Sequence, residues 1–319
     1  MTEALQKPLD RRRRVYPDVV SLLVDGWPTP LARLKSECRN GVEVWAKLEC
    51  YNPFSRSVKD RPVWNMLRRA LEEGKVGRKL YEATSGNVGI ALPALCNFYG
   101  LEFTAFLPKK PPAVTLKLLR ILGARIVETD YETISPEFWR WVASLAERDG
   151  ALNLNQFEND ANPEVHYRTL ANELIEQLEA VGRKPDFVIA GIGTSGHIYA
   201  ISKRMREKYG DEVKIVGVQP APDSRIPGIK RVETKPKWLE KARSDRIVDI
   251  SLEEAVEGVV RVARREGLLI GLSAGAVYQA YRRLAVEGWR GVYVLVFPDD
   301  VFKYVDIIAE HLARGNQRG

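Results

Sequence analysis

A lysine stands at the start of a predicted helix, in a segment rich in turn-forming and hydroxyl residues. Residues 52–61 have the sequence NPFSRSVKDR, so Lys59 directly precedes an amphipathic stretch at residues 60–71. The positive end of a helix dipole and partial burial both disfavour a charged amine and lower its pKa. Such an amine can form a Schiff base with a carbonyl compound, which makes Lys59 a candidate nucleophile. Taken alone, the segment is better explained by a surface lysine beside a helix cap at Ser57.

A second loop of small residues joins a predicted strand at residues 80–83 to a predicted helix at residues 87–99. Its backbone amides and hydroxyl groups can bind a carboxylate at the helix N-terminus. The side-chain amide of Asn87 can also donate a hydrogen bond to a phenolate oxygen. A simple helix cap would explain the same pattern. The candidate binding residues of this loop are Thr84, Ser85, Gly86 and Asn87.

A third loop, GIGTSGH at residues 191–197, directly follows a predicted strand at residues 186–190. Glycines let the backbone approach a phosphate, amides and hydroxyls surround it, and the following helix adds its dipole. The loop also fits the GxGxxG pattern of dinucleotide-binding folds, in which an acidic residue closes the next strand. That strand ends at Gln219, which weakens the nucleotide alternative. The candidate phosphate-binding residues of this glycine cup are Gly191, Gly193, Thr194, Ser195, Gly196 and His197.

A fourth loop, GLSAGA at residues 271–276, carries Ser273 at another strand-to-helix turn. By itself this segment is also explained by a helix cap. Ligands of open α/β sheets bind at the carboxyl ends of the strands, which is where these loops fall. The positions of the loops therefore favour one shared site.

The elements that must position these loops alternate between short β-branched runs and amphipathic stretches from residue 43 onward. The pattern predicts strands at residues 43–49 and 152–155, a helix at residues 163–179, and a less regular stretch at residues 219–246. This alternation is typical of stacked βαβ units with mostly parallel sheets. A chain of 319 residues at 45% hydrophobic content is long enough for two compact cores. We therefore expect an α/β protein of two open, mostly parallel twisted-sheet domains with a cleft between them. The smaller domain is expected at residues 43–160, and the larger at residues 1–42 and 161–319.

The composition argues against several other classes of protein. The formal net charge of +7 comes from 49 Lys and Arg against 42 Asp and Glu, spread through the sequence. Only residues 11–14 form a basic run, and no nucleic-acid module accompanies it. Three cysteines without a CxxC pair and three scattered histidines favour neither a disulfide framework nor a metal site.

No apolar run approaches the roughly 18 residues that a membrane helix needs, and the N-terminal residues lack the apolar stretch of a signal peptide. We therefore expect a cytoplasmic protein with no membrane or nucleic-acid partner. The high content of Glu, Lys and Arg, together with few Cys and Met, resembles the composition of thermophile proteins.

Taken together, the four loops resemble, in order and approximate spacing, the signature of the fold-type II enzymes that depend on pyridoxal 5′-phosphate (PLP). The resemblance extends from about residue 29 to the end of the chain. It implies a fold like that of the tryptophan synthase β chain, with PLP in the cleft between the domains. It also implies that Lys59 forms the Schiff base, that Asn87 contacts O3′ of PLP, and that Ser273 meets the pyridine nitrogen. The glycine cup of the larger domain would hold the phosphate, and the loop at residues 84–87 of the smaller domain would bind the substrate carboxylate.

A serine partner for the pyridine nitrogen has a chemical consequence. Unlike an aspartate, a serine hydroxyl does not keep this nitrogen protonated, so the ring is a weaker electron sink and β-elimination competes well. The resemblance implies that Lys59 removes the Cα proton and that a leaving group departs from Cβ. The product of these steps is an α-aminoacrylate, to which a nucleophile adds.

Within this superfamily the sequence resembles the cysteine synthases, particularly the archaeal type that uses O-phosphoserine. The segments that carry this resemblance are YNPFS, NQF, GTSGH, QPA and IPGI. They imply a homodimer that makes L-cysteine from O-phospho-L-serine, and also from O-acetyl-L-serine, with sulfide. Gln156 corresponds to a glutamine that helps to bind the substrate carboxylate. His197 replaces a threonine of the acetylserine enzymes and is shared with the phosphoserine type.

A phosphorylated leaving group needs a cation, and the loop at residues 223–234 supplies Lys230 and Arg231. The phosphoserine enzymes have an arginine at the position of Lys230, and lysine keeps the charge without the bidentate fork. An exposed pair of loop cations is the alternative explanation. The sequence also departs from the family at Asp299-Asp300-Val301, where an Asp is usually followed by Ser or Thr and then Gly.

Other activities remain open at this point. The same chemistry would allow condensation of serine with homocysteine, as in cystathionine β-synthase. A serine or threonine dehydratase usually shows a different lysine motif. A nucleotide-dependent oxidoreductase would explain the GxGxxG pattern but not Lys59, Asn87 or Ser273. A catalytically silent relative that binds PLP is a further alternative.

Overall fold

The computed structural model describes residues 14–316 and divides into two compact units. The first unit comprises Met1–Pro28 and Asn52–Val165, and the second comprises Thr29–Tyr51 and His166–Gly319. The chain therefore enters the second unit early, returns to the first, and ends in the second. Of the basic run at residues 11–14, residues 11–13 lie outside the described residues.

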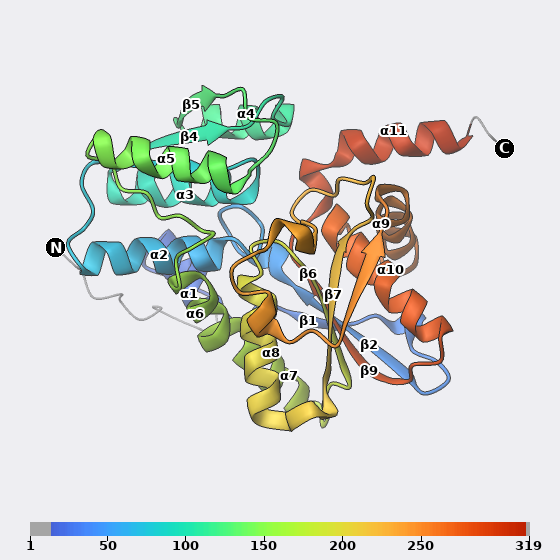
Figure 1. The fold of residues 1–319 in the computed structure, drawn as a ribbon. Helices are drawn as coiled ribbons and strands as arrows, with labels where there is room; N and C mark the ends of the chain where they lie inside the picture. Colours follow the sequence, from blue (N-terminus) through green and yellow to red (C-terminus); the bar gives the residue numbers. More distant parts are fainter. Residues whose placement is uncertain (1–13, 317–319) are drawn as a thin grey trace. The chain divides into compact units, whose positions relative to one another are not determined.

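The first unit is built on a parallel sheet in the order β3 (Lys79–Ala83), β4 (Glu102–Leu107) and β5 (Arg125–Glu128). Helices α3, α4 and α5 surround this sheet (Figure 1). Apolar side chains of the strands and helices form its core, including Leu80, Leu95 and Leu119. The helices of this unit are α1 (Val19–Val24), α2 (Asp60–Glu72), α3 (Asn87–Tyr99), α4 (Ala113–Ile121) and α5 (Pro136–Arg148). The unit ends at Val165, within α6 (Ala161–His166).

The second unit is built on a six-stranded sheet in the order β1-β2-β9-β6-β7-β8. All its strand pairs are parallel except the antiparallel pair of β1 and β2. Helices α9 and α10 lie on one face of the sheet, and α7 and α8 lie on the other (Figure 1). The strands are β1 (Leu31–Arg33), β2 (Val42–Leu48), β6 (Phe187–Gly191), β7 (Lys214–Pro220), β8 (Arg246–Ile250) and β9 (Gly291–Phe297), and the helices are α7 (Asn172–Glu179), α8 (Gly196–Tyr209), α9 (Leu252–Glu266), α10 (Leu272–Val286) and α11 (Val305–Asn316).

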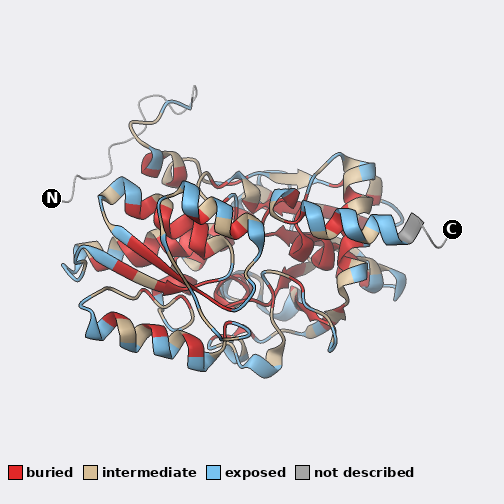
Figure 2. Ribbon diagram, turned by 90° about the horizontal axis from the view of Figure 1, so that it is seen from above, coloured by how far each residue is buried: buried red, intermediate tan, exposed pale blue. Residues whose placement is uncertain are grey.

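Burial follows the layers of each unit. Buried residues lie along the strands, and exposed residues lie along the outer sides of the helices (Figure 2). The central strands of the second unit bury residues on both faces, as covered parallel sheets do. The prediction of an α/β protein with mostly parallel sheets is confirmed. Within residues 14–316, no helix is both long and apolar enough to span a membrane.

The compact units differ from the expected domains in three places. One is the last change between units, which falls after residue 165 rather than after residue 160. The strand at residues 43–49, expected in the smaller domain, is β2 of the second unit, because all seven of its residues pair with β9. Residues 14–28, expected in the larger domain, belong to the first unit, because Val20 of α1 packs in its apolar core. The change between units therefore falls at residue 52 rather than at residue 43.

Three predicted elements have a different form in the structure. The strand expected at residues 152–155 is reduced to a single bridge between Leu152 and Leu80. The helix expected at residues 163–179 is divided by a π-turn at Tyr167–Ala171. The irregular stretch expected at residues 219–246 ends in the unpredicted strand β8, which forms the edge of the sheet beside β7.

Candidate active site

Lys59 is the N-cap residue of α2 and is half-buried. The loop before it is organised by Asp60, whose carboxylate accepts hydrogen bonds from the backbone amides of Phe54 (2.7 Å) and Ser55 (2.9 Å). The hydroxyls of Ser55 and Ser57 lie 2.7 Å apart, and the backbone amide of Lys59 donates to Ser57 Oγ (3.1 Å). This network fixes the lysine backbone at the positive end of the helix dipole.

A second layer of contacts supports the same loop. The guanidinium of Arg61 is fully buried and lies 4.6 Å from the centre of a Trp27 ring. Trp27 Nε1 donates to Asn52 Oδ1 (2.9 Å), at the first residue of the NPFS segment. The residues around Lys59 in the motif thus build a rigid frame for the lysine.

The loop after β3 uses Thr84 as its internal anchor. Thr84 Oγ1 accepts hydrogen bonds from the backbone amides of Gly89 (2.9 Å) and Gly86 (3.4 Å). Thr84 therefore caps the start of α3, which is the alternative that the sequence left open for this loop. Thr84 is buried, Ser85 is exposed, and Gly86 and Asn87 are half-buried. A Cβ added at Gly86 would meet no atom within 4 Å. Residues 85–87 therefore have open space beside their backbone.

Gln156 lies at the same end of β3 as the Thr84 loop, and its backbone is held from two sides. Its amide donates to Glu82 Oε1 (3.2 Å), and its carbonyl accepts from Asn162 Nδ2 (2.8 Å). Burial raises the pKa of Glu82 to about 7, against the opposing effect of backbone hydrogen bonds from Gln156, Asn155 and Leu154. The first unit thus brings together two of the predicted substrate-binding segments.

The glycine cup connects the end of β6 to the start of α8, and all seven of its residues are buried. A Cβ added at Gly191 would lie 2.6 Å from Ile229 Cγ2, and one added at Gly193 would lie 2.8 Å from the carbonyl oxygen of Gly228. Both glycines are therefore required by a close approach to the loop at residues 226–230. The backbone amide of Lys230 closes this contact by donating to the carbonyl of Ile192 (2.6 Å).

Within the cup, Ser195 adopts the left-handed backbone conformation (φ 67°) that helps to form anion-binding nests. Its hydroxyl donates to the carbonyl of Thr194 (2.6 Å) and accepts from the backbone amide of Trp238 (3.2 Å). The buried ring of His197 packs edge-on against the buried ring of His166, at 6.0 Å between ring centres. The Ser195 hydroxyl thus shapes the loop itself, and the rings of His197 and His166 lie side by side.

Ser273 lies in the first turn of α10 and is buried. A Cβ added at Gly228 would lie 3.8 Å from Ser273 Oγ. Since Gly228 also touches Gly193, the loop at residues 226–230 brings Ser273 and the glycine cup together. The second unit therefore gathers the predicted phosphate-binding residues and the predicted ring-nitrogen partner.

The departure at residues 299–301 has a structural role beside Ser273. The carbonyl of Asp299 accepts from the backbone amide of Gly271 (3.0 Å), and its carboxylate accepts from Tyr304 OH (2.5 Å). Asp300 pairs with Ile270 in a β-bridge. The two aspartates therefore hold the turn that leads into α10.

The two predicted loop cations, Lys230 and Arg231, have different surroundings. Lys230 is half-buried against the cup loop, and burial lowers the pKa of its amine to about 8. The guanidinium of Arg231 instead donates to the carbonyl of Pro220 (2.7 Å) and pairs with Glu233 (2.7 Å). It also lies 3.7 Å from Asp249 Oδ1, so it is held against the edge of the sheet.

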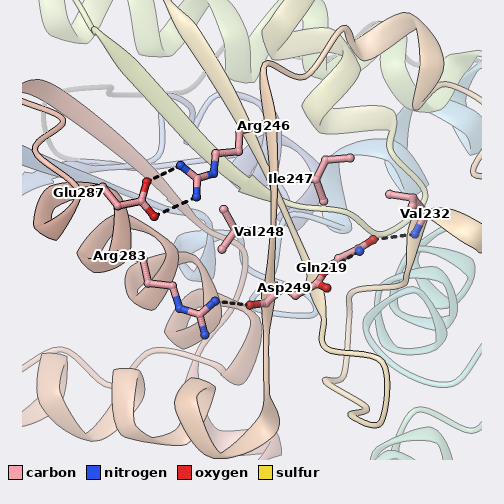
Figure 3. Close-up of a pocket in the computed structure, with 8 residues that line it drawn as sticks. All are labelled: Gln219, Val232, Arg246, Ile247, Val248, Asp249, Arg283 and Glu287. Carbon is pink, nitrogen blue, oxygen red and sulfur yellow. Dashed lines mark hydrogen bonds and ion pairs between the residues drawn. The ribbon is translucent and has the colours of Figure 1, made fainter.

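A hollow of about 430 Å³ lies over this edge of the sheet (Figure 3). Arg246 pairs with Glu287 there, and Arg283 pairs with Glu254. These arginines already contact carboxylates, so the hollow has compensated charge and lacks the character of an anion site. The residues that line it are Gln219, Val232, Arg246, Ile247, Val248, Asp249, Arg283 and Glu287.

The end of β7 also bears on the nucleotide alternative. A dinucleotide site needs an acidic side chain at that position to bind a ribose. Gln219 stands there, its Nε2 donates to Asp249 (2.6 Å), and its Oε1 accepts from the amide of Val232 (2.8 Å). Because the amide is used for local structure, the geometry does not favour nucleotide binding.

The features of each unit fit a part of a phosphorylated cofactor. The second unit has a buried cup whose glycines leave no room for side chains, with a buried hydroxyl beside the same loop. The first unit has a lysine framed at a helix N-terminus. These features define the class of α/β enzymes that hold a phosphorylated cofactor at a glycine-rich loop.

Comparison with known proteins gives the family. Residues 22–299 match the model of the family described as pyridoxal-phosphate dependent enzymes, and the chain belongs to this family. Its cofactor is pyridoxal 5′-phosphate.

The chain is similar to bacterial cysteine synthases along most of its length. It is 34% identical to cysteine synthase of Aquifex aeolicus over 292 residues, covering 87% of this chain and 88% of the relative. It is 35% identical to cysteine synthase B of Pseudomonas aeruginosa over 295 residues, covering 91% and 96%. The crystal structure of O-ureido-L-serine synthase matches with a TM-score of 0.83 and 28% identity, covering 91% of this chain and 94% of that one.

The sequence predictions missed the residues that support the site. Asp60, Arg61 and Glu82 carry charge next to predicted binding residues, and Gly228 lies in the quoted IPGI segment. A charged residue inside an otherwise apolar or small-residue stretch is a usable signal, because burial of a charge needs a partner. The contact between Gly228 and Gly193 has no such local signal, since it joins distant segments.

Proposed function

We propose that this protein is a PLP-dependent β-replacement enzyme that makes L-cysteine from an activated L-serine and sulfide. The observation that carries the proposal is the placement of Ser273 beside the Gly228 loop and the glycine cup. A neutral hydroxyl partner for the pyridine nitrogen favours loss of a β-substituent. Similarity to cysteine synthases over about nine-tenths of the chain supports the same chemistry.

The proposed roles follow the two units. PLP supplies an electron sink for the substrate Cα when it is bound. Lys59 would hold the cofactor covalently and move the proton at Cα, and Asn87 would donate to O3′. The cup and Ser273 would bind the phosphate and the pyridine nitrogen. The residues proposed for the substrate carboxylate are Thr84, Ser85, Gly86 and Gln156.

Formation of cysteine from sulfide tests the proposal directly. The PLP-loaded enzyme should be assayed with O-phosphoserine, O-acetylserine and serine in separate reactions. Cysteine from at least one donor is expected. If no donor gives sulfide-dependent cysteine, the proposed function is wrong. Replacing sulfide with homocysteine tests the cystathionine alternative. The proposal also includes a homodimer, which analytical sedimentation of the enzyme tests.

We further propose that the donor is O-phosphoserine and that Lys230 binds its phosphate. Lys230 is half-buried, and its backbone amide donates to the glycine cup at Ile192, whereas the guanidinium of Arg231 is held at the edge of the sheet by the carbonyl of Pro220. A partly desolvated ammonium group binds a dianion more strongly than an exposed one does. This arrangement would favour a phosphorylated donor over a neutral ester.

Lys230→Gln is expected to lower kcat/KM for O-phosphoserine by roughly 10- to 100-fold, since a hydrogen bond to a charged group contributes about 1.5–3 kcal/mol. The value for O-acetylserine should change less than about threefold, because its acetyl group is neutral. Lys235→Gln removes the same charge from an exposed position directly after this loop and serves as the control. An equal loss for both donors would contradict the assignment of Lys230.

The pH dependence of donor choice gives a second prediction. The Lys230 pKa is lowered to about 8, so its charge is present below that pH and is lost as the pH rises above it. The ratio of kcat/KM for O-phosphoserine to that for O-acetylserine should therefore fall between pH 7 and pH 9. Lys230→Arg keeps its charge over this range, so its ratio should stay flat. A wild-type ratio that is independent of pH would count against the prediction.

A further inference from the structure

Glu82 is a buried carboxylate for which the proposed reaction provides no role. It lies on β3, and only 2% of its surface is exposed. Its oxygens accept hydrogen bonds from the backbone amides of Asn155 (3.1 Å) and Gln156 (3.2 Å) and from Asn153 Nδ2 (3.2 Å). A carboxylate in this position costs free energy through desolvation, so its place in the fold calls for a reason. The three donors all belong to one loop, so the structural reason for Glu82 is to hold this loop in place.

The loop that Glu82 holds contains a residue in an unfavourable backbone conformation. Asn155 has φ 48°, in the left-handed region that a non-glycine residue adopts only at some cost. Such a conformation persists only where the surrounding structure fixes it. Glu82 fixes it directly through the amide of Asn155, and the adjacent amide of Gln156 is held by the other carboxylate oxygen.

The same strand holds the second predicted substrate-binding loop. Side chains at positions 82 and 84 lie on the same face of an extended strand. The Thr84 amide continues the strand pairing to the carbonyl of Phe106 (3.0 Å), and its hydroxyl anchors the turn into α3 through Gly89 (2.9 Å). Glu82 of β3 and Thr84, the first residue after this strand, thus anchor two loops within the first unit.

We propose that Glu82 is a positioning residue for the amino-acid substrate, because its buried carboxylate fixes the backbone of Asn155 and Gln156 relative to the Thr84 loop. This inference rests on the proposed roles of Gln156 and the Thr84 loop in binding the substrate carboxylate. Glu82 acts through these residues and does not itself touch the substrate.

The test compares two substitutions at this position in the PLP-loaded enzyme. Glu82→Ala removes both acceptors, whereas Glu82→Gln keeps one carbonyl oxygen and turns an NH₂ group toward a backbone donor. Glu82→Ala is expected to raise the donor KM by roughly 10- to 100-fold, the size of effect that a misplacement near 1 Å produces. Glu82→Gln should show an intermediate increase. The affinity for PLP and its visible absorbance should remain unchanged in both variants.

A control separates positioning from general stability. Leu119→Ala removes a fully buried side chain from α4 of the same unit and is expected to lower the melting temperature without raising the donor KM. If the Glu82 variants lose stability but keep the wild-type KM, the positioning role is wrong. If Glu82→Ala does not fold, Glu82→Gln carries the same comparison.

Measuring donor binding as well as turnover distinguishes failure of the Glu82 role from failure of the proposed function. Titration of each enzyme with O-phosphoserine, O-acetylserine and serine, followed by the PLP absorbance, gives a dissociation constant that needs no sulfide. A wild-type enzyme that binds a donor but makes no cysteine would overturn the proposed function and still test Glu82. A wild-type enzyme that makes cysteine, with Glu82 variants of unchanged donor affinity, would overturn the role of Glu82 alone. Failure of the wild type to bind any donor would overturn both.

Discussion

Lys59→Ala is expected to abolish the visible absorbance of bound PLP near ~410 nm and to lower cysteine formation by on the order of 10³-fold or more. The proposed lysine both anchors the cofactor and moves the Cα proton, so one substitution removes two functions. The frame around it should persist, because Asp60 holds Phe54 and Ser55 through backbone amides that do not involve the lysine side chain. Absorbance spectra and steady-state rates measure the two effects separately.

Lys75→Ala is the matched control for that experiment. Lys75 is exposed near the end of α2 and pairs with Glu73, so its removal should leave both the absorbance and the rate close to wild type. Retention of the visible band and of turnover in Lys59→Ala would show that another residue holds the cofactor.

Gly193→Ala is expected to weaken the affinity for PLP by at least about 10-fold and to destabilise the protein by about 1–3 kcal/mol. The new Cβ would lie 2.8 Å from the carbonyl oxygen of Gly228, which is backbone and cannot rotate away. Either the cup or the loop at residues 226–230 must shift, and that loop also touches Ser273. A PLP titration followed by absorbance, together with thermal unfolding of the apoenzyme, measures both changes.

Gly77→Ala provides a glycine substitution without such a clash. Its Cβ would meet the carbonyl of Gly150 at 3.8 Å, an ordinary van der Waals distance. PLP affinity should therefore remain at the wild-type level in this variant. If Gly193→Ala binds PLP as tightly as Gly77→Ala does, the cup does not hold the phosphate as proposed.

The alternation of strands and helices was predictable because it depends on local periodicity. The helix starts after Lys59 and Gly86 agree with the structure for the same reason. The unit boundary was not predictable in this way. The strand β2 is only seven residues long, and its pairing with β9, more than two hundred residues away, assigns it to the second unit.

The site was predictable to a similar degree. Glycines, hydroxyls and a lysine in strand-to-helix turns mark the loops, since those residue types are needed wherever backbone binds an anion. The tertiary contacts that surround these loops have weaker signals in the sequence. Adjacent in sequence, Lys230 and Arg231 looked equivalent, yet Arg231 is held by Pro220, Glu233 and Asp249. The different surroundings of two neighbouring cations depend on tertiary contacts, which local sequence does not reveal.

The hydrogen bond from the backbone amide of Lys230 to the carbonyl of Ile192 bears on how donor preference can change in evolution. Position 230 is joined to the cup through its main chain (2.6 Å), and that hydrogen bond is available to every residue except proline. Different side chains can therefore occupy the position while the loop keeps its course. In the proposed assignment Lys230 selects the donor, so a substitution at this one position would change the preferred activated serine while the cofactor site is kept.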